Sequence, residues 1–321
     1  ANGDLTINAA VESRSANVTA TSTENIIVTA AGSITSVGGN VVLNSDTDTA
    51  TSAGGGIRIL GTVTSADGDI TLGGGADPAA TNTVATATSG NDGIQIDGGT
   101  LDAAAGDISL RGSSTLDDGI GIQNGATIQT TSGVISLNGT STTASGDDGV
   151  EITGVGTTIT SATGSISVVG VGSAGDGVDI SSDAVVSSTG TATITIDGTS
   201  TAVDQAGVRL QDTDTQITSV DGNVSITGAN SNNLGVFVTS GVEISSTGTG
   251  TGAATITITG TGDAGIDIDT AGTLITSVDG DILLDGNANT LEGIRIAEAT
   301  ISSTGTTADA ATITLDGSSN G

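Results

Sequence analysis

The 321-residue chain contains no Cys, Met, Trp, Tyr, His or Lys, and it has one Phe and one Pro. Without Cys and His, neither a zinc ligand set nor a nucleophile–imidazole pair can be assembled. Five Arg oppose 36 Asp and Glu, which gives a net charge of −31. Binding of nucleic acid or of an anionic membrane surface needs clustered Lys and Arg. The sequence also lacks an apolar run of about 20 residues, so we expect neither a nucleic-acid partner nor membrane insertion.

The sequence repeats itself instead. Residues 216–228 read QITSVDGNVSITG, and residues 274–286 read LITSVDGDILLDG. Both segments end in a strand, named strand C here, of the form Ile-x-Leu/Ile followed by Gly. Its first apolar residues are Leu5, Val41, Ile70, Ile108, Ile135, Ile166, Ile194, Val224, Ile256, Ile282 and Ile313. Ten steps between Leu5 and Ile313 give a mean period of about 31 residues, which is typical of repeat architectures.

Two further strands precede strand C in each unit. Strand A reads Gly-Ile/Val-x-Ile and begins at Ile57, Ile94, Ile120, Val150, Val178, Val208, Val236, Ile266 and Ile294. Strand B is centred on Ile34, Val63, Leu101, Ile128, Ile159, Val186, Ile217, Ile244, Ile275 and Ile301. Alternating apolar and polar residues indicate half-buried strands. We therefore predict an all-β, right-handed parallel β-helix with three short strands per coil and about ten to eleven coils. Residues 1–321 then form a single repetitive β-solenoid.

The repeat predicts contacts between coils. Two residues after the strand B aliphatic, eight of ten units carry Ser: Ser36, Ser65, Ser161, Ser188, Ser219, Ser246, Ser277 and Ser303. We interpret this as a structural column in which hydroxyls bond along the rod, because a catalytic serine would occur once. On the outward side of strand A, stacking in register places Asp179 opposite Arg209 and Asp267 opposite Arg295.

No catalytic, cofactor or metal residue is assigned from the sequence, but two features suggest ligands. The turns Asp67-Gly68-Asp69 and Asp279-Gly280-Asp281, with the related turn at 221–223, could hold calcium, which prefers oxygen ligands. Asp-Gly is also ordinary turn chemistry. The outward positions of strands B and C are rich in Thr and Ser, which suits either an ice-binding or mineral-templating face or simply the solvent side of strands.

The variable turn between strands C and A is longest between Gly74 and Gly93, with eighteen residues. It is either a tolerated insertion or a binding surface. A carbohydrate-active β-helix, as an enzyme or a binding module, is the alternative function. Glycosidases need two carboxylates in a sugar-binding cleft, and the carboxylates are plentiful. The near absence of aromatics and bases argues against such a cleft, so we do not expect an enzyme.

Three segments resemble the repeats of filamentous-haemagglutinin-type bacterial adhesins: SANVTATSTENIIVTAAGSITSVGGNVVLNSDTD at 15–48, GGGIRILGTVTSADGDITLGGG at 54–75 and GDISLRGSS at 106–114. The pattern recurs over essentially the whole chain. The resemblance implies a β-helical shaft of a large secreted surface protein. We expect an extracellular structural or adhesive role at a bacterial surface, with surface glycans or a host surface as partners. Because the chain starts inside a strand C and stops just after another strand C, with no capping helix at either end, we expect continuation into further repeats or end-to-end stacking with a second copy.

Overall fold

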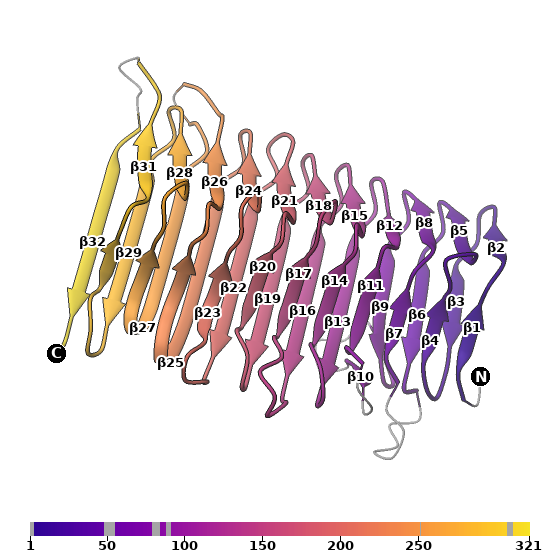
Figure 1. Ribbon diagram of the computed structural model, residues 1–321. Helices are drawn as coiled ribbons and strands as arrows, with labels where there is room; N and C mark the ends of the chain where they lie inside the picture. The colour runs from indigo at the N-terminus through magenta and orange to yellow at the C-terminus, as the bar shows by residue number, and fades with distance from the viewer. Residues whose placement is uncertain (1–2, 48–54, 79–83, 88–90, 251, 307–310) are drawn as a thin grey trace.

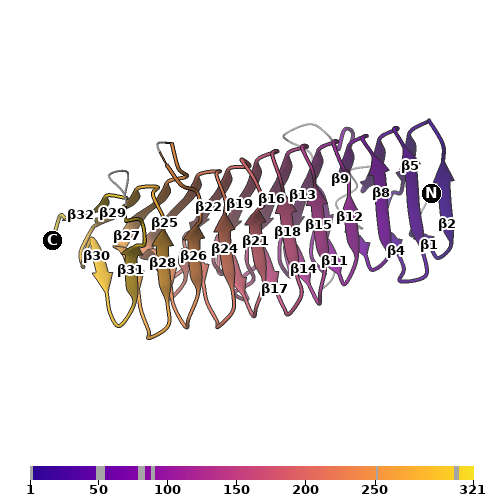
Figure 2. The ribbon, with the colours of Figure 1, turned by 90° about the horizontal axis from the view of Figure 1, so that it is seen from above.

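The chain folds as a parallel β-solenoid with three columns of strands (Figure 1). The structure is a computed structural model that describes residues 3–47, 55–78, 84–87, 91–250, 252–306 and 311–321. In these residues every regular element is a β-strand, and every pairing is parallel, from one coil to the next. The coils stack from the N-terminal end to the C-terminal end of one rod (Figure 2). The fold expected from the sequence is confirmed.

Column B is a separate sheet of eleven strands. It contains β2 (Ala10–Ser13), β5 (Ser33–Val37), β8 (Thr62–Ala66), β12 (Thr100–Asp102), β15 (Thr127–Thr130), β18 (Thr158–Ser161), β21 (Val185–Ser188), β24 (Gln216–Ser219), β26 (Glu243–Ser246), β28 (Leu274–Ser277) and β31 (Thr300–Ser303). Val11 in β2 and Ile301 in β31 occupy the same position, 290 residues and ten steps apart. The mean coil is therefore 29 residues long.

Columns A and C belong to one continuous sheet. Column C contains β3 (Val18–Thr21), β6 (Val41–Ser45), β9 (Ile70–Gly74), β13 (Ile108–Ser114), β16 (Ile135–Ser141), β19 (Ile166–Gly172), β22 (Ile194–Ser200), β29 (Ile282–Ala288) and β32 (Ile313–Ser319). Column A contains β1 (Leu5–Ile7), β4 (Ile26–Val28), β7 (Ile57–Ile59), β11 (Ile94–Asp97), β14 (Ile120–Gln123), β17 (Val150–Thr153), β20 (Val178–Ser181), β23 (Ala206–Leu210) and β30 (Ile294–Ile296). β25 (Val224–Val238) and β27 (Ile256–Ile268) run through both columns, and β10 (Ala85–Ala87) pairs with β13.

The structure corrects the position of Leu5. Its strand, β1, pairs with β4 at Leu5–Ile26, so it belongs to column A and not to column C. Column C begins instead with Val18, which pairs with Val41. The predicted period of about 31 residues was too long because it counted from the wrong strand. Strands A and C both alternate apolar and polar residues, and Leu5 lacks the Gly that directly precedes strand A from Ile57 onward.

The core is a thin stack of aliphatic ladders. In column C, Ile108, Ile135, Ile166 and Ile194 pair in register, and all four are fully buried. Each coil thus covers the apolar side chains of the coil before it, and burial of this kind is the main stabilising contribution. The core grows only along the axis, so every added coil adds length.

The serine column is present but bonds differently from the prediction. Ser219 donates to the carbonyl of Gly222, and Ser65 donates to that of Gly68, both in the turn between columns B and C. Thr130 donates to the Gly133 carbonyl at 2.6 Å and also contacts the Ser161 hydroxyl at 3.0 Å in the next coil. Of the eight serines, three donate to a carbonyl of their own coil and two, Ser36 and Ser303, donate to a carbonyl of the preceding coil. Within the described residues, Ser246 and Ser277 have no hydrogen-bond partner.

Candidate cation site at the turns before column A

Four successive coils place an aspartate at the same point of the turn that leads into column A. Asp92, Asp118, Asp148 and Asp176 each precede the Gly before β11, β14, β17 and β20. A side chain is not tolerated at that Gly: a Cβ on Gly149 would lie 2.2 Å from the Val171 nitrogen. The turn is therefore tight, and it fixes each aspartate directly above its equivalent in the neighbouring coil.

The aspartates form a hydrogen-bonded ladder along the rod. The Asp148 backbone N–H donates to Asp118 Oδ1 at 2.6 Å, and the Asp176 backbone N–H donates to Asp148 Oδ1 at 2.6 Å. Asp176 Oδ1 in turn accepts the backbone N–H of Ala206, where the ladder ends. Each carboxylate thus satisfies an amide of the following coil that would otherwise be buried without a partner.

One outward residue of column A, from the following coil, lies behind each of these four aspartates, and its chemistry changes from coil to coil. Behind Asp92 lies Gly121, where a Cβ would be 2.2 Å from Asp92 Oδ2. Behind Asp118 lies Glu151, and behind Asp148 lies Asp179. Behind Asp176 lies Arg209, whose Nε donates to Asp176 Oδ2 at 2.6 Å. The guanidinium carbon of Arg209 also lies over the Phe237 ring, 5.4 Å from the ring centroid.

Among the described residues, Asp176 is thus the one of these four aspartates that has a cation as its partner in the column A row. Several of the other carboxyl groups have raised pKa values. Burial raises the pKa of Asp148 to about 9, with repulsion from Asp176 and Asp179 adding to it. Burial and Asp176 raise the pKa of Asp179 to about 8. Burial also raises the pKa of Asp92 to about 7, and that of Asp118 is raised as well. A desolvated cluster of like charges favours either a proton or a counter-ion.

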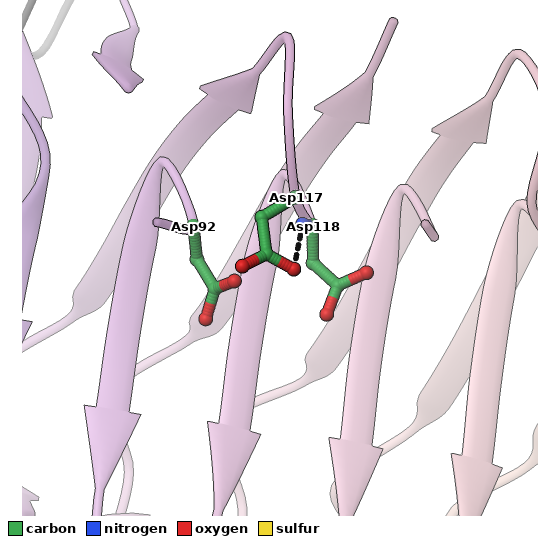
Figure 3. Close-up of side chains that lie close together, drawn as sticks. All are labelled: Asp92, Asp117 and Asp118. Atoms are coloured by element: carbon green, nitrogen blue, oxygen red, sulfur yellow. Dashed lines mark hydrogen bonds between the residues drawn. The ribbon is translucent and has the colours of Figure 1, made fainter. Parts of the chain in front are cut away.

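In the part of the chain that the structure describes, two groups of three carboxylates have geometry suited to a metal ion. In each group, one oxygen of every member lies within 4.8 Å of the others: Asp92, Asp117 and Asp118 in one, and Asp148, Asp176 and Asp179 in the other. Figure 3 shows the first group, in which the Asp118 N–H donates to the Asp117 carboxylate at 3.3 Å. The second group is more buried, with exposed fractions of 9% for Asp148, 3% for Asp176 and 8% for Asp179.

The Asp-Gly-Asp turns singled out in the sequence lie elsewhere, between columns B and C. Their carboxylates bond to the neighbouring coil: Asp69 Oδ1 accepts the Asp107 N–H at 3.0 Å, and Asp281 Oδ1 accepts the Thr312 N–H at 2.7 Å. Asp67 has φ 70°, the left-handed conformation that Asp tolerates in turns. Within the described ranges, neither turn contributes to a group of three acidic side chains, so calcium at these turns stays a prediction.

The predicted ladder partners of Arg209 and Arg295 are confirmed. Of the two ion pairs that this pairing suggested, only the one of Arg295 is formed. Arg295 pairs with Asp267 at 2.7 Å, as expected. Arg209 lies opposite Asp179 in the ladder, yet its ion pair is with Asp176. The outward Thr and Ser row of column C stacks in register, from Thr71 to Thr314, with Leu283 interrupting it. In column B, Asp102 and Gln129 interrupt the corresponding row.

Sequence reasoning missed the aspartate ladder, although a signal was present. Asp-Gly recurs directly before strand A at Asp92, Asp118, Asp148 and Asp176, with steps of 26, 30 and 28 residues that follow the coils. Read one turn at a time, Asp-Gly is common turn chemistry. The recurrence becomes informative only once the coils are stacked. The long insertion between Gly74 and Gly93 lies partly outside the described residues, at 79–83 and 88–90.

Among the residues that the structure describes, no helix has the length and apolar character needed to cross a membrane. Comparisons with protein-family models, with curated proteins and with solved structures found no match to this chain.

Proposed function

We propose that the chain is a structural and adhesive β-solenoid, the shaft of an extracellular fibre or giant adhesin at a bacterial surface, without catalytic activity. One observation supports this above others. The three columns stack in register from coil to coil, and the same residue types recur at the same positions. A fold that repeats one unit along one axis supplies length and a long lateral surface.

The exposed last strand of the stack supports a role in longer assemblies. In the last coil, Ile313 and Leu315 are 40% and 52% exposed, whereas their ladder partners Ile282 and Leu284 are fully buried. An uncovered apolar strand with free backbone groups favours pairing with another strand. We propose that a further coil covers β32, either from the same polypeptide or from a second copy that stacks end to end.

Electron microscopy of the native material tests the proposal. We expect thin filaments with an axial repeat near 4.8 Å, the spacing of strands in a sheet. Binding of these filaments to bacterial-surface glycans and to host-cell surfaces would then be measured with gold-labelled filaments. Discrete rods on the order of 50 Å long that bind no surface would contradict the proposal.

A carbohydrate-active module is the second candidate. A surface hollow beside Asp92 is lined by Asn25, Arg58, Asn91 and Gln95, side chains of the kind that bond to sugar hydroxyls. Its volume of about 110 Å³ is well below the roughly 300–1,000 Å³ of typical ligand pockets. Release of reducing sugar from a panel of polysaccharides would favour this candidate over the shaft. The third candidate, an ice-binding or mineral-templating face, is weakened by the interruptions in both Thr and Ser rows.

A further inference from the structure

We propose that Asp148, Asp176 and Asp179 form a binding site for one calcium ion that links two successive coils of the solenoid. Asp148 comes from the turn before β17, whereas Asp176 and Asp179 come from the turn before β20 and from β20 itself. An ion among them would therefore join neighbouring coils at the point where acidic groups concentrate.

The spacing of the oxygens fits calcium. One oxygen of each carboxylate lies within 4.8 Å of the other two. Calcium binds oxygen at about 2.3–2.6 Å, so two ligands on opposite sides of the ion are separated by at most about 5 Å. Carboxylate oxygens that already accept a backbone or guanidinium N–H keep further lone pairs for an ion.

An unpartnered oxygen provides the second, independent indication. Asp179 Oδ1 is buried and has no hydrogen-bond partner among the described residues, while Oδ2 of the same group accepts from Gln211 at 2.9 Å. Leaving a buried carboxylate oxygen without a partner is costly. The oxygen belongs to a residue that is 8% exposed and sits in the group of three carboxylates, so a cation bound there would satisfy it.

The neighbouring coil shows what is missing. Arg209 occupies the position of Asp179 one coil later and neutralises Asp176. At the preceding step, the residue that faces Asp148 is the carboxylate of Asp179 instead of a cation. When ionised, three carboxylates beside one guanidinium leave a net charge of about −2, which matches a divalent ion. Calcium suits the site better than magnesium, because magnesium demands near-octahedral geometry and keeps several waters.

Isothermal titration of calcium chloride into the chelator-treated full chain, in 150 mM NaCl, tests the proposal. We expect one saturable site per chain with a Kd on the order of 10⁻⁴–10⁻³ M, as in extracellular calcium modules. Asp179→Asn and Asp148→Asn should each weaken this site at least tenfold. Both substitutions are isosteric, and the amide oxygen introduced by Asp148→Asn would still accept the Asp176 N–H, so a β-type circular dichroism spectrum should be retained.

Asp267→Asn is the matched control, because Asp267 occupies the same row of column A and has its own partner in Arg295. Its calcium affinity should stay within twofold of the unmodified chain. If the Asp179 and Asp267 variants bind calcium equally well, calcium binding would be due to diffuse attraction by acidic surface groups, and the proposal would be overturned. Absence of saturable binding up to 5 mM calcium, together with a higher calcium-free melting temperature for Asp179→Asn, would show that a proton neutralises the cluster, and would also overturn it.

Discussion

Arg209 and Asp179 are ladder partners in adjacent strands, yet the guanidinium of Arg209 bonds to Asp176. The reason is that the Arg209 side chain leans back toward the turn of the preceding coil, where Asp176 lies. Asp179 likewise acts on Asp148 of the preceding coil, whereas Arg58 pairs with Asp97 of the following coil and Arg295 with its ladder partner Asp267. This relationship makes single substitutions in the row informative, because the same backbone position can be tested with and without a buried carboxylate behind it.

Arg209→Gln should destabilise the chain substantially. The substitution leaves the Asp176 carboxylate, whose side chain is 4% exposed, without its ion-pair partner, and removes the contact with Phe237. Breaking a buried ion pair by removing one partner costs about 3–5 kcal/mol. The midpoint of guanidinium chloride unfolding at pH 7 measures the effect. Arg295→Gln is the control: that arginine side chain is 46% exposed, so its loss should shift the midpoint far less. Similar shifts for the two variants would contradict this account of Arg209.

Asp92→Asn should raise stability at alkaline pH and change it little at acid pH. Burial, with repulsion from Asp117 and Glu151, raises the pKa of Asp92 from 3.8 to about 7. Between these values the folded chain holds a proton that the unfolded chain has released. The free energy of unfolding therefore falls as pH rises from about 4 to about 7. The difference between the two pKa values corresponds to a loss of at most roughly 4 kcal/mol in the free energy of unfolding. The Asn variant has no carboxyl group to ionise at this position, so it does not lose this free energy.

Unfolding midpoints at pH 4.5 and pH 8.5 measure this difference. Asp97→Asn serves as the control of opposite sign, because the Asn124 amide and Arg58 lower the pKa of Asp97. The stabilising contribution of Asp97 is present above about pH 4 and is lost as the pH falls through the lowered pKa. Asp97→Asn should thus be destabilising at pH 8.5. An Asp92 variant that loses stability at pH 8.5 as well would refute the assignment of a raised pKa.

The fold could be predicted from the sequence because each coil repeats the same strand patterns in the same order. Ile-x-Leu/Ile in column C and Gly-Ile-x-Ile in column A fix both the burial of alternate residues and the register, as the pairing of Ile135 with Ile166 illustrates. The position of Leu5 could not be fixed in this way, since the pattern around it suits either column. Only its pairing with Ile26 decides between them.

The candidate cation site could not be predicted from residue spacing alone. Its members come from two turns and one strand, and their proximity depends on how far each side chain leans toward the neighbouring coil. The sequence showed that Asp179 lies opposite Arg209, but not that Arg209 turns to Asp176. Because Arg209 pairs with Asp176, Asp179 is left beside Asp148, and the acidic group forms. Side-chain direction, which no periodicity encodes, is thus the missing information.

Ser219→Ala should cost about 1 kcal/mol, whereas Ser277→Ala should be neutral or slightly stabilising. Both serines occupy the same buried position of column B. The Ser219 hydroxyl donates to the Gly222 carbonyl, but the Ser277 hydroxyl is buried and finds no hydrogen-bond partner in the described part of the chain. A net intramolecular hydrogen bond is worth about 1 kcal/mol, and removal of an unsatisfied buried hydroxyl relieves a desolvation cost. Thermal melts of the two variants check this, and a larger loss for Ser277→Ala would contradict it.

Leu284→Ala and Leu315→Ala test whether another coil covers the last strand. The two leucines are ladder partners in β29 and β32, but Leu284 is fully buried and Leu315 is 52% exposed. In the isolated 321-residue chain, Leu284→Ala should cost about 2–5 kcal/mol. Leu315→Ala should cost no more than about 0.5 kcal/mol, as surface substitutions do.

If a further coil stacks on β32 in the native assembly, Leu315 becomes a core residue there. Its substitution should then destabilise filaments as strongly as that of Leu284, measured as the guanidinium concentration that dissolves them. A Leu315 variant whose filaments resist guanidinium like the unmodified ones would show that β32 stays uncovered.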